Sequence, residues 1–120
     1  MSVVDHMPES DIFDRLMDQI HRRALSMPEG SYTTKLIGGG PAKMGAKILE
    51  EVLETTLAAN EPGDDGRAHL LYEACDVIYH LWVLLGSKGI HVSELRAELT
   101  RREGLSGLEE KKRRNQEKTE

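Results

Sequence analysis

Five acidic side chains fall into two short groups whose chemistry suits a divalent metal ion. Glu50, Glu51 and Glu54 form the first group, and Glu73 and Asp76 form the second. Carboxylate oxygens, without a cysteine or an obligatory histidine, favour a hard cation such as Mg²⁺, or Mn²⁺ in its place, over zinc. Such a cation keeps coordination positions for water and for phosphate oxygens, so it neutralises phosphate charge and activates a water molecule. The pattern therefore indicates a site for phosphate hydrolysis.

Two predicted helices carry these acidic groups. On a helix over residues 41–59, at about 100° per residue, the first group and Lys47 share an arc of roughly 100°. A helix over residues 65–87 is apolar over most of its circumference, so we expect it to be central and largely buried. Its polar exceptions lie on one narrow stripe, formed by His69, Glu73, Asp76 and His80. Because buried acids need a partner, this stripe calls for a cation.

A turn around Pro62 predicts that the two helices run antiparallel and bring the acidic groups together. At about 1.5 Å per residue, residues whose numbers sum to about 124 lie level, so Glu51 lies beside Glu73, and Glu54 lies within a turn of Glu73 and Asp76. Two carboxylates about 5 Å apart repel by roughly 3 kcal/mol at an effective dielectric constant of about 20. A small domain of ordinary stability does not sustain several such repulsions. A bound cation is the simplest compensation.

The whole sequence predicts an all-α fold. We find no alternating strand pattern, internal repeat or domain linker. Asp64 or Asp65 is expected to cap the third helix and Ser93 the fourth, and residues 28–40 are expected to form a loop. We expect a loose leader over residues 1–9, one domain over 10–104 and a charged tail over 105–120. The four predicted helices cover residues 11–27, 41–59, 65–87 and 93–103.

The composition excludes several classes of protein. A net charge of −5 argues against a general nucleic-acid binder, which needs a positive face. The longest apolar stretch, residues 77–86, is too short to span a bilayer, and the N-terminus lacks a signal-peptide pattern, so we expect a cytoplasmic protein without a membrane partner. The single cysteine, Cys75, excludes an intrachain disulfide, and its apolar neighbours predict a buried thiol. A chain of 120 residues buries only a modest core, so pairing with a second copy would bury more apolar surface.

These motifs resemble those of the all-α nucleoside triphosphate pyrophosphohydrolases, the MazG-like superfamily. Glu50-Glu51-x-x-Glu54, followed by Glu73-x-x-Asp76, is similar to the metal-binding signature of that superfamily. Three segments resemble its phosphoribosyl-ATP pyrophosphatase branch, and the resemblance covers residues 10–103. The segments are Ser31-Tyr32-Thr33-x-x-Leu36-x-x-x-Gly40, Lys43-Met44-x-x-Lys47-x-x-Glu50-Glu51, and the run from Tyr72 to Leu81.

The resemblance implies a Mg²⁺-dependent homodimer that hydrolyses phosphoribosyl-ATP between its α- and β-phosphates in histidine biosynthesis. Lys43 and Lys47 would meet phosphate oxygens. Glu50 would ligate a further ion or orient the attacking water. The implied metal ligands are Glu51, Glu54, Glu73 and Asp76, and the implied substrate contacts are Ser31, Tyr32 and Thr33.

Two alternative functions stay open at this point. The same chemistry could act on dUTP, dCTP or damaged nucleotides, although the Ser-Tyr-Thr segment argues against this. The chain could also be a non-enzymatic helical dimerisation module whose acids are solvated surface.

For single residues, Tyr32 could instead anchor its loop against the bundle, and His80 could be a helix histidine whose hydrogen bonds are satisfied, so His80 is left out of the predicted site.

Overall fold

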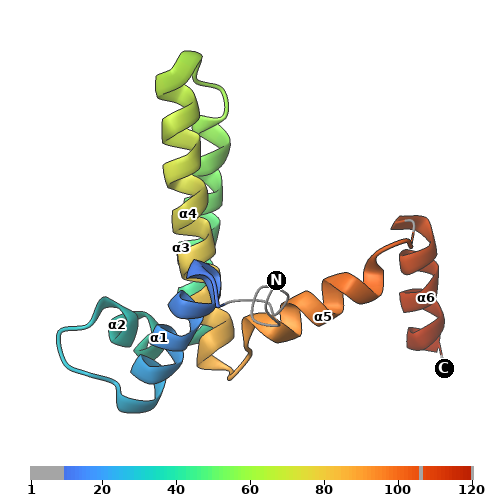
Figure 1. Ribbon diagram of the computed structural model, residues 1–120, viewed down its shortest axis with the longest axis horizontal. Helices are drawn as coiled ribbons and strands as arrows, with labels where there is room; N and C mark the ends of the chain where they lie inside the picture. Colours follow the sequence, from blue (N-terminus) through green and yellow to red (C-terminus); the bar gives the residue numbers. More distant parts are fainter. Residues whose placement is uncertain (1–9, 106, 120) are drawn as a thin grey trace, which may run out of the picture.

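The computed structural model describes residues 10–105 and 107–119, which form six α-helices and contain no β-strand (Figure 1). The prediction of an all-α fold is confirmed. Four of the six helices match the four predicted ones in position. The helices are α1 (Ile12–Ser26), α2 (Tyr32–Gly38), α3 (Gly40–Ala58), α4 (Gly63–Ser87), α5 (Val92–Arg102) and α6 (Gly107–Thr119).

Helices α3 and α4 form a long antiparallel hairpin that projects from the rest of the molecule (Figure 1). Within the hairpin, buried residues recur every seven positions on each helix, which places them on one face. They are Met44, Glu51 and Ala58 on α3, and Gly66, Glu73 and His80 on α4; Val83 and Gly86 of α4 are buried as well, in and beside the core. The hairpin turn is tight, because a Cβ atom at Gly66 would overlap the backbone carbonyl of Glu61. This register brings Glu51 level with Glu73.

The apolar core lies at the foot of the hairpin, where α1 and α2 pack against α3 and α4 (Figure 1). Ile20 of α1, Met44 of α3 and Val83 of α4 are buried together there. Gly86 lets α1 approach α4 closely, because a Cβ atom at that position would lie 2.6 Å from Cγ2 of Ile20. The core therefore anchors one end of the hairpin and fixes the two helices that carry the acidic residues.

Helix α5 is tied to α1 by an ion pair with two hydrogen bonds. Arg96 donates from Nη1 and Nη2 to the two carboxylate oxygens of Asp14, each at 2.8 Å. Asp14 also completes a capping box with Asp11 at the start of α1. Further along the chain, Arg101 of α5 donates to Glu110 of α6 at 2.9 Å. These polar contacts hold the C-terminal helices, which extend away from the hairpin (Figure 1).

Several local expectations were wrong. The predicted loop contains α2, because the Ser31 side chain caps the helix by accepting from the backbone N–H of Thr34. The charged tail, for which the sequence predicts no complete helix, contains α6, and this does not contradict the expectation of a charged tail. Helix α4 begins after Pro62 without a side-chain cap, and His91, rather than Ser93, caps α5. The predicted loose leader, residues 1–9, lies outside the described residues.

The expectation that the third predicted helix is largely buried was also wrong for part of its surface. Leu71 and Tyr72 of α4 are exposed, and the thiol of Cys75 is exposed rather than buried. The sequence pattern records which side chains are apolar, but a single copy of the chain covers only part of the α4 circumference. No helix among the described residues is both long and apolar enough to cross a membrane.

Candidate active site

Three carboxylates from two helices converge inside the α3–α4 hairpin. Glu51 and Glu54 come from α3 and Glu73 from α4, and one ligand oxygen from each lies within 4.8 Å of the other two. Glu51 and Glu73 are only 5% and 9% exposed, whereas Glu54 stands at the solvent edge of the group. The three residues form what we call the acidic cluster. Their arrangement matches the donor set that a hard divalent cation requires.

Two oxygens of the acidic cluster are buried without a hydrogen-bond partner. They are Oε2 of Glu51 and Oε2 of Glu73. An unpaired buried carboxylate oxygen is costly, because burial removes water and supplies no compensating donor. The other oxygen of each carboxylate does have a neighbour: Lys47 Nζ lies 3.3 Å from Oε1 of Glu51, and His69 Nε2 lies 3.2 Å from Oε1 of Glu73. A divalent cation would supply the partner that these buried carboxylate oxygens lack, so the residues present fit such an ion.

The pKa values around the acidic cluster reflect burial and crowding of negative charge. Burial, followed by the negative charges of Glu51 and Glu73, raises the pKa of Glu54 above its ordinary value. The same causes raise the pKa of Asp76. A hydrogen bond with Glu51 raises the pKa of Lys47 and keeps its ammonium group charged. Each shift has the sign expected where several carboxylates share one small volume.

Asp76 and Glu50 flank the acidic cluster without joining its closest group. Asp76 lies one turn after Glu73 on α4 and is half-buried, and it is close enough to Glu51 and Glu73 for their charges to act on its carboxyl group. Glu50 is exposed and pairs with Lys47 Nζ at 3.5 Å. Both side chains thus border the acidic cluster, since the charge of Glu50 also acts on the carboxyl group of Glu54.

The remaining predicted residues lie on α2 and on the first half of α3. Ser31 caps α2, Thr33 is fully buried and hydrogen-bonded to Tyr79, and Tyr32 is half-exposed. The charges of Lys47, Glu51 and Glu50 all act on the Tyr32 phenol, whose pKa is raised mainly by burial, so Tyr32 faces the same region. Lys43 is exposed one turn before Lys47. The structure thus brings one edge of α2 to the acidic cluster.

Residues 13–103 match the model of the phosphoribosyl-ATP pyrophosphohydrolase family. The chain belongs to this family. The matched region includes all three residues of the acidic cluster and most of α1 through α5.

Similar proteins from several bacteria carry corresponding names. A phosphoribosyl-ATP pyrophosphatase of Rhodopirellula baltica is 55% identical over 106 residues, covering 88% of this chain and 88% of that protein. Phosphoribosyl-ATP pyrophosphatase 1 of Bradyrhizobium diazoefficiens is 44% identical over 110 residues, covering 92% and 100%. A histidine biosynthesis bifunctional protein of Wolinella succinogenes is 36% identical over 118 residues, which cover 95% of this chain and 50% of that protein.

Two histidines of the polar stripe that were left out of the predicted site touch it, and His80 has both of its ring nitrogens hydrogen-bonded, as its alternative interpretation expected. His69 bridges Glu61 and Glu73, with Nδ1 lying 2.6 Å from Oε2 of Glu61. His80 bonds the Tyr32 hydroxyl. The spacing of four residues from His69 to Glu73 was a signal for the first contact, because such pairs are neighbours on a helix. The second contact joins α2 to α4, and no sequence pattern indicates it.

Proposed function

We propose that this protein hydrolyses phosphoribosyl-ATP between its α- and β-phosphates, giving phosphoribosyl-AMP and pyrophosphate, as a step of histidine biosynthesis in the cytoplasm. The observation that carries the proposal is the acidic cluster, Glu51, Glu54 and Glu73, in a chain of the phosphoribosyl-ATP pyrophosphohydrolase family. The catalytic domain spans residues 10–104, and residues 105–120 form an appended charged tail.

The cofactor in this proposal is Mg²⁺, for which Mn²⁺ can substitute. Glu51, Glu54, Glu73 and Asp76 would hold it, and the two buried oxygens without partners support this choice of residues. When bound, the ion supplies charge neutralisation for the phosphates and lowers the pKa of a coordinated water molecule. Oxygen ligands without thiolates favour these hard ions over zinc.

The other charged residues bind the substrate and orient the water. Lys47 already lies between Glu50 and Glu51, so its ammonium group can bridge the acidic cluster and a phosphate oxygen. Lys43, one turn earlier, adds a second positive charge on the path of the triphosphate. Glu50 is exposed and acceptor-only when ionised, which suits it to orient the attacking water or to ligate a further ion. Ser31 and Tyr32 contact the substrate at the start of α2, whereas Thr33 is fully buried and only helps to hold α2 in place through its hydrogen bond with Tyr79.

Turnover assays with a panel of substrates test this proposal. The purified protein with Mg²⁺ should release pyrophosphate from phosphoribosyl-ATP in preference to dUTP, dCTP or oxidised nucleotides. Asp76→Asn should abolish turnover while helical circular dichroism is retained. A strong preference for one of the other triphosphates would assign the same chemistry to nucleotide clearance instead. Failure to bind Mg²⁺ or Mn²⁺ in a calorimeter would favour a non-enzymatic module.

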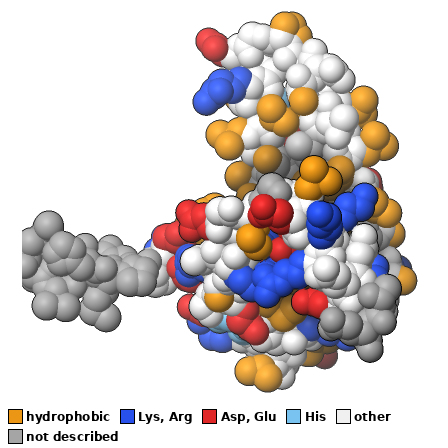
Figure 2. Space-filling model, turned by 90° about the vertical axis from the view of Figure 1, so that its right-hand side faces the viewer, with side chains coloured by type: hydrophobic (Ala, Val, Ile, Leu, Met, Phe, Trp, Pro, Cys, Tyr) orange, Lys and Arg blue, Asp and Glu red, His pale blue; other side chains and the backbone are white. Residues whose placement is uncertain are grey.

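We also propose that two copies of the chain associate through the exposed apolar side chains of the hairpin. Hydrophobic side chains are scattered over the surface of the projecting part of the molecule (Figure 2). Burying a side chain of this size contributes about 1.5–3 kcal/mol, so this surface favours association. The exposed side chains are Leu49, Leu53 and Leu57 on α3 and Leu71 and Tyr72 on α4.

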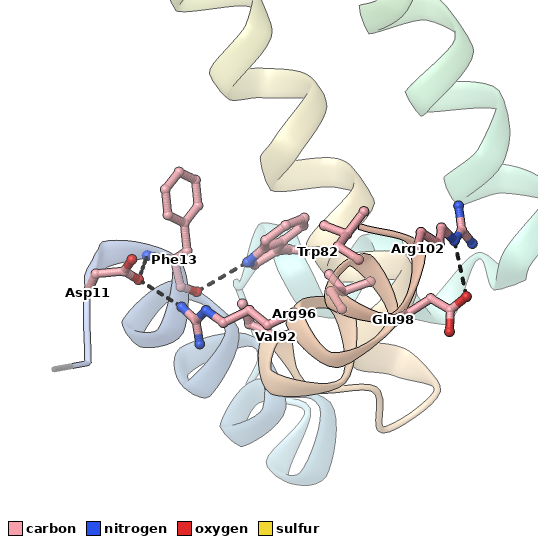
Figure 3. A pocket seen from close by; sticks show the side chains of 9 residues that line it. Asp11, Phe13, Trp82, Val92, Arg96, Glu98 and Arg102 are labelled. Carbon is pink, nitrogen blue, oxygen red and sulfur yellow. Dashed lines mark hydrogen bonds and ion pairs between the residues drawn. The ribbon is translucent and has the colours of Figure 1, made fainter. Parts of the chain in front are cut away.

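A second apolar surface lies near the foot of the hairpin and can contribute to the same association. It is a groove of about 540 Å³ between α1, α4 and α5 (Figure 3). Its floor is apolar, and the ion pairs Arg96–Asp11 and Arg102–Glu98 stand at its edges. An apolar floor with a charged rim is the usual anatomy of a protein interface.

Sedimentation velocity on two matched variants tests the dimer. Leu53→Glu places a charge in the middle of the exposed apolar stripe of α3 and should give a monomer. Leu25→Glu makes the same change on α1, where the side chain is 89% exposed and lies beside the C-terminal end of α4 rather than beside the exposed stripe of α3, and should remain dimeric. A monomeric wild-type protein at micromolar concentration, or a dimeric Leu53→Glu variant, would contradict this assignment.

A further inference from the structure

His80 makes two hydrogen bonds that together fix where its proton lies. It is 6% exposed on α4. Its Nδ1 lies 2.7 Å from the backbone carbonyl oxygen of Asp76, and its Nε2 lies 2.9 Å from the hydroxyl oxygen of Tyr32 on α2. A carbonyl oxygen only accepts, so Nδ1 must carry the hydrogen. In the neutral ring, Nε2 is then left with a lone pair and no hydrogen.

This arrangement determines what Tyr32 can offer to a ligand. The Tyr32 hydroxyl must donate its only hydrogen to Nε2 of His80. Its oxygen retains lone pairs, so toward any further partner Tyr32 is an acceptor only. A phosphate oxygen without a proton cannot bond to such a group, whereas a hydroxyl or an amino group can.

The surrounding contacts hold Tyr32 in this orientation. Thr33, the next residue, is fully buried and bonds the Tyr79 hydroxyl at 2.7 Å. The Tyr32 and Tyr79 rings stack with centroids 6.3 Å apart and an interplanar angle of 13°, and His80 stands edge-on to both. Tyr32 is nevertheless 49% exposed, so a ligand can reach it. Two adjacent residues of α2 are thus bonded to two adjacent residues of α4, one turn beyond Asp76.

We propose that His80 is a positioning residue: it fixes the Tyr32 hydroxyl as a hydrogen-bond acceptor, and Tyr32 then recognises a hydroxyl or amino donor of the nucleotide rather than its phosphates. This inference rests on the proposed function and assigns a chemical role to one of its substrate contacts. It divides the site into two parts. Lys43 and Lys47 serve the phosphates, and α2 serves the neutral, donor-bearing part of the substrate.

Two substitutions at position 80 separate the two hydrogen bonds. His80→Asn keeps an amide N–H near the Asp76 carbonyl but has no atom that reaches Tyr32. His80→Gln carries an acceptor oxygen at about the reach of Nε2. We expect His80→Asn to raise KM for phosphoribosyl-ATP about 3- to 10-fold, the loss of one hydrogen bond, with a smaller change in kcat. His80→Gln should stay within about twofold of the wild type.

His21→Asn is the matched control for a general loss of packing. Its Nε2 bonds the backbone oxygen of Ile90 at 2.9 Å between α1 and the α4–α5 connection, away from the acidic cluster. This variant should leave KM unchanged. In a double-mutant cycle, His80→Asn should add nothing to KM in a Tyr32→Phe background, because His80 acts through the Tyr32 hydroxyl. Independent, additive effects of the two substitutions would overturn the proposal.

A substrate made with dATP in place of ATP distinguishes the possible donors. If the missing ribose hydroxyl is the group that Tyr32 accepts from, wild-type KM rises and the Tyr32→Phe variant no longer distinguishes the two substrates. If wild-type KM is unchanged, an amino group of the base or another hydroxyl is the donor. A Tyr32→Phe variant with wild-type KM on both substrates would contradict recognition by Tyr32.

Nitrogen-15 NMR of the wild-type protein tests the proton arrangement without any turnover. The neutral His80 ring should carry its hydrogen on Nδ1, and its Nε2 resonance should shift in Tyr32→Phe. A hydrogen on Nε2 of the neutral ring, or a doubly protonated ring, would overturn the inference even if the protein hydrolyses phosphoribosyl-ATP. Conversely, an inactive wild-type protein with the expected tautomer would refute the proposed function and leave the acceptor role of Tyr32 intact.

Discussion

Replacing Glu73 by Gln should make the metal-free protein more stable and remove most of its stabilisation by Mg²⁺. Glu73 is 9% exposed, and its carboxylate approaches that of Glu51 within 4.8 Å. Two charges at this separation repel by about 3 kcal/mol at an effective dielectric constant of about 20. The glutamine amide of the Glu73→Gln variant keeps only part of the contact that the Glu73 carboxylate makes with His69. Because the His69 side chain is 45% exposed, this loss costs up to about 1 kcal/mol. The net gain is about 2–3 kcal/mol, or about 8–12 °C in Tm at about 4 °C per kcal/mol for a domain of this size.

Thermal unfolding in EDTA and in excess Mg²⁺ measures both parts of this prediction. At a Mg²⁺ concentration of about 100 times Kd, the wild type should gain about 2.7 kcal/mol, and Glu73→Gln much less. Glu50→Gln is the control on the neighbouring helix. Its carboxylate is 57% exposed, so its stability in EDTA should change by no more than about 0.5 kcal/mol. A loss of stability for Glu73→Gln in EDTA, or an undiminished gain from Mg²⁺, would refute the reasoning.

Three further predictions concern other parts of the molecule. Lys47→Gln should raise KM in the pyrophosphate-release assay by about 10-fold or more, the loss of one charge-assisted hydrogen bond, and an unchanged KM would remove Lys47 from the phosphate site. Gly86→Ala should destabilise the fold by about 1–3 kcal/mol in urea unfolding, because the new Cβ would crowd Cγ2 of Ile20; a neutral effect would mean that α1 shifts freely. The Arg96 hydrogen bonds hold the pKa of Asp14 well below its ordinary value of 3.8. The Asp14–Arg96 pair therefore stabilises the fold fully above pH 3.8, and this stabilisation is lost as the pH falls through the lowered pKa of Asp14. Asp14→Asn should therefore lower Tm at pH 7 and have a smaller effect below pH about 3, as read from a pH series of melting curves; an equal effect at all pH values would contradict the assignment.

The acidic cluster was accessible from the sequence because it depends on helix geometry alone. Helical rise and one turn at Pro62 predicted that Glu51 lies beside Glu73, and the buried faces of α3 and α4 meet in this register. Apolar spacing also predicted the positions of α1, α3, α4 and α5, since a helix interior leaves a regular pattern. These inferences need no knowledge of contacts between distant segments.

Other features depend on tertiary contacts that leave no local pattern. Ser31 caps α2 locally, but Tyr32 and Thr33 also hold this short helix in place by bonding two side chains of α4, forty-six or more positions further along. The exposure of Cys75 likewise follows from which faces of α4 a single copy of the chain covers. Turn-forming residues predict a loop over residues 28–40, and apolar neighbours predict a buried thiol at Cys75. Both expectations were wrong because tertiary packing decides these two features.

Anomalous diffraction from a crystal grown with Mn²⁺ tests the central claim most directly. The claim is that oxygens of Glu51, Glu54 and Glu73 come within 4.8 Å of one another in order to hold a divalent cation. The account predicts an anomalous peak within about 2.0–2.4 Å of these oxygens, including the two that have no hydrogen-bond partner. A crystal with no manganese at these carboxylates, or with their oxygens turned apart into solvent, would contradict it.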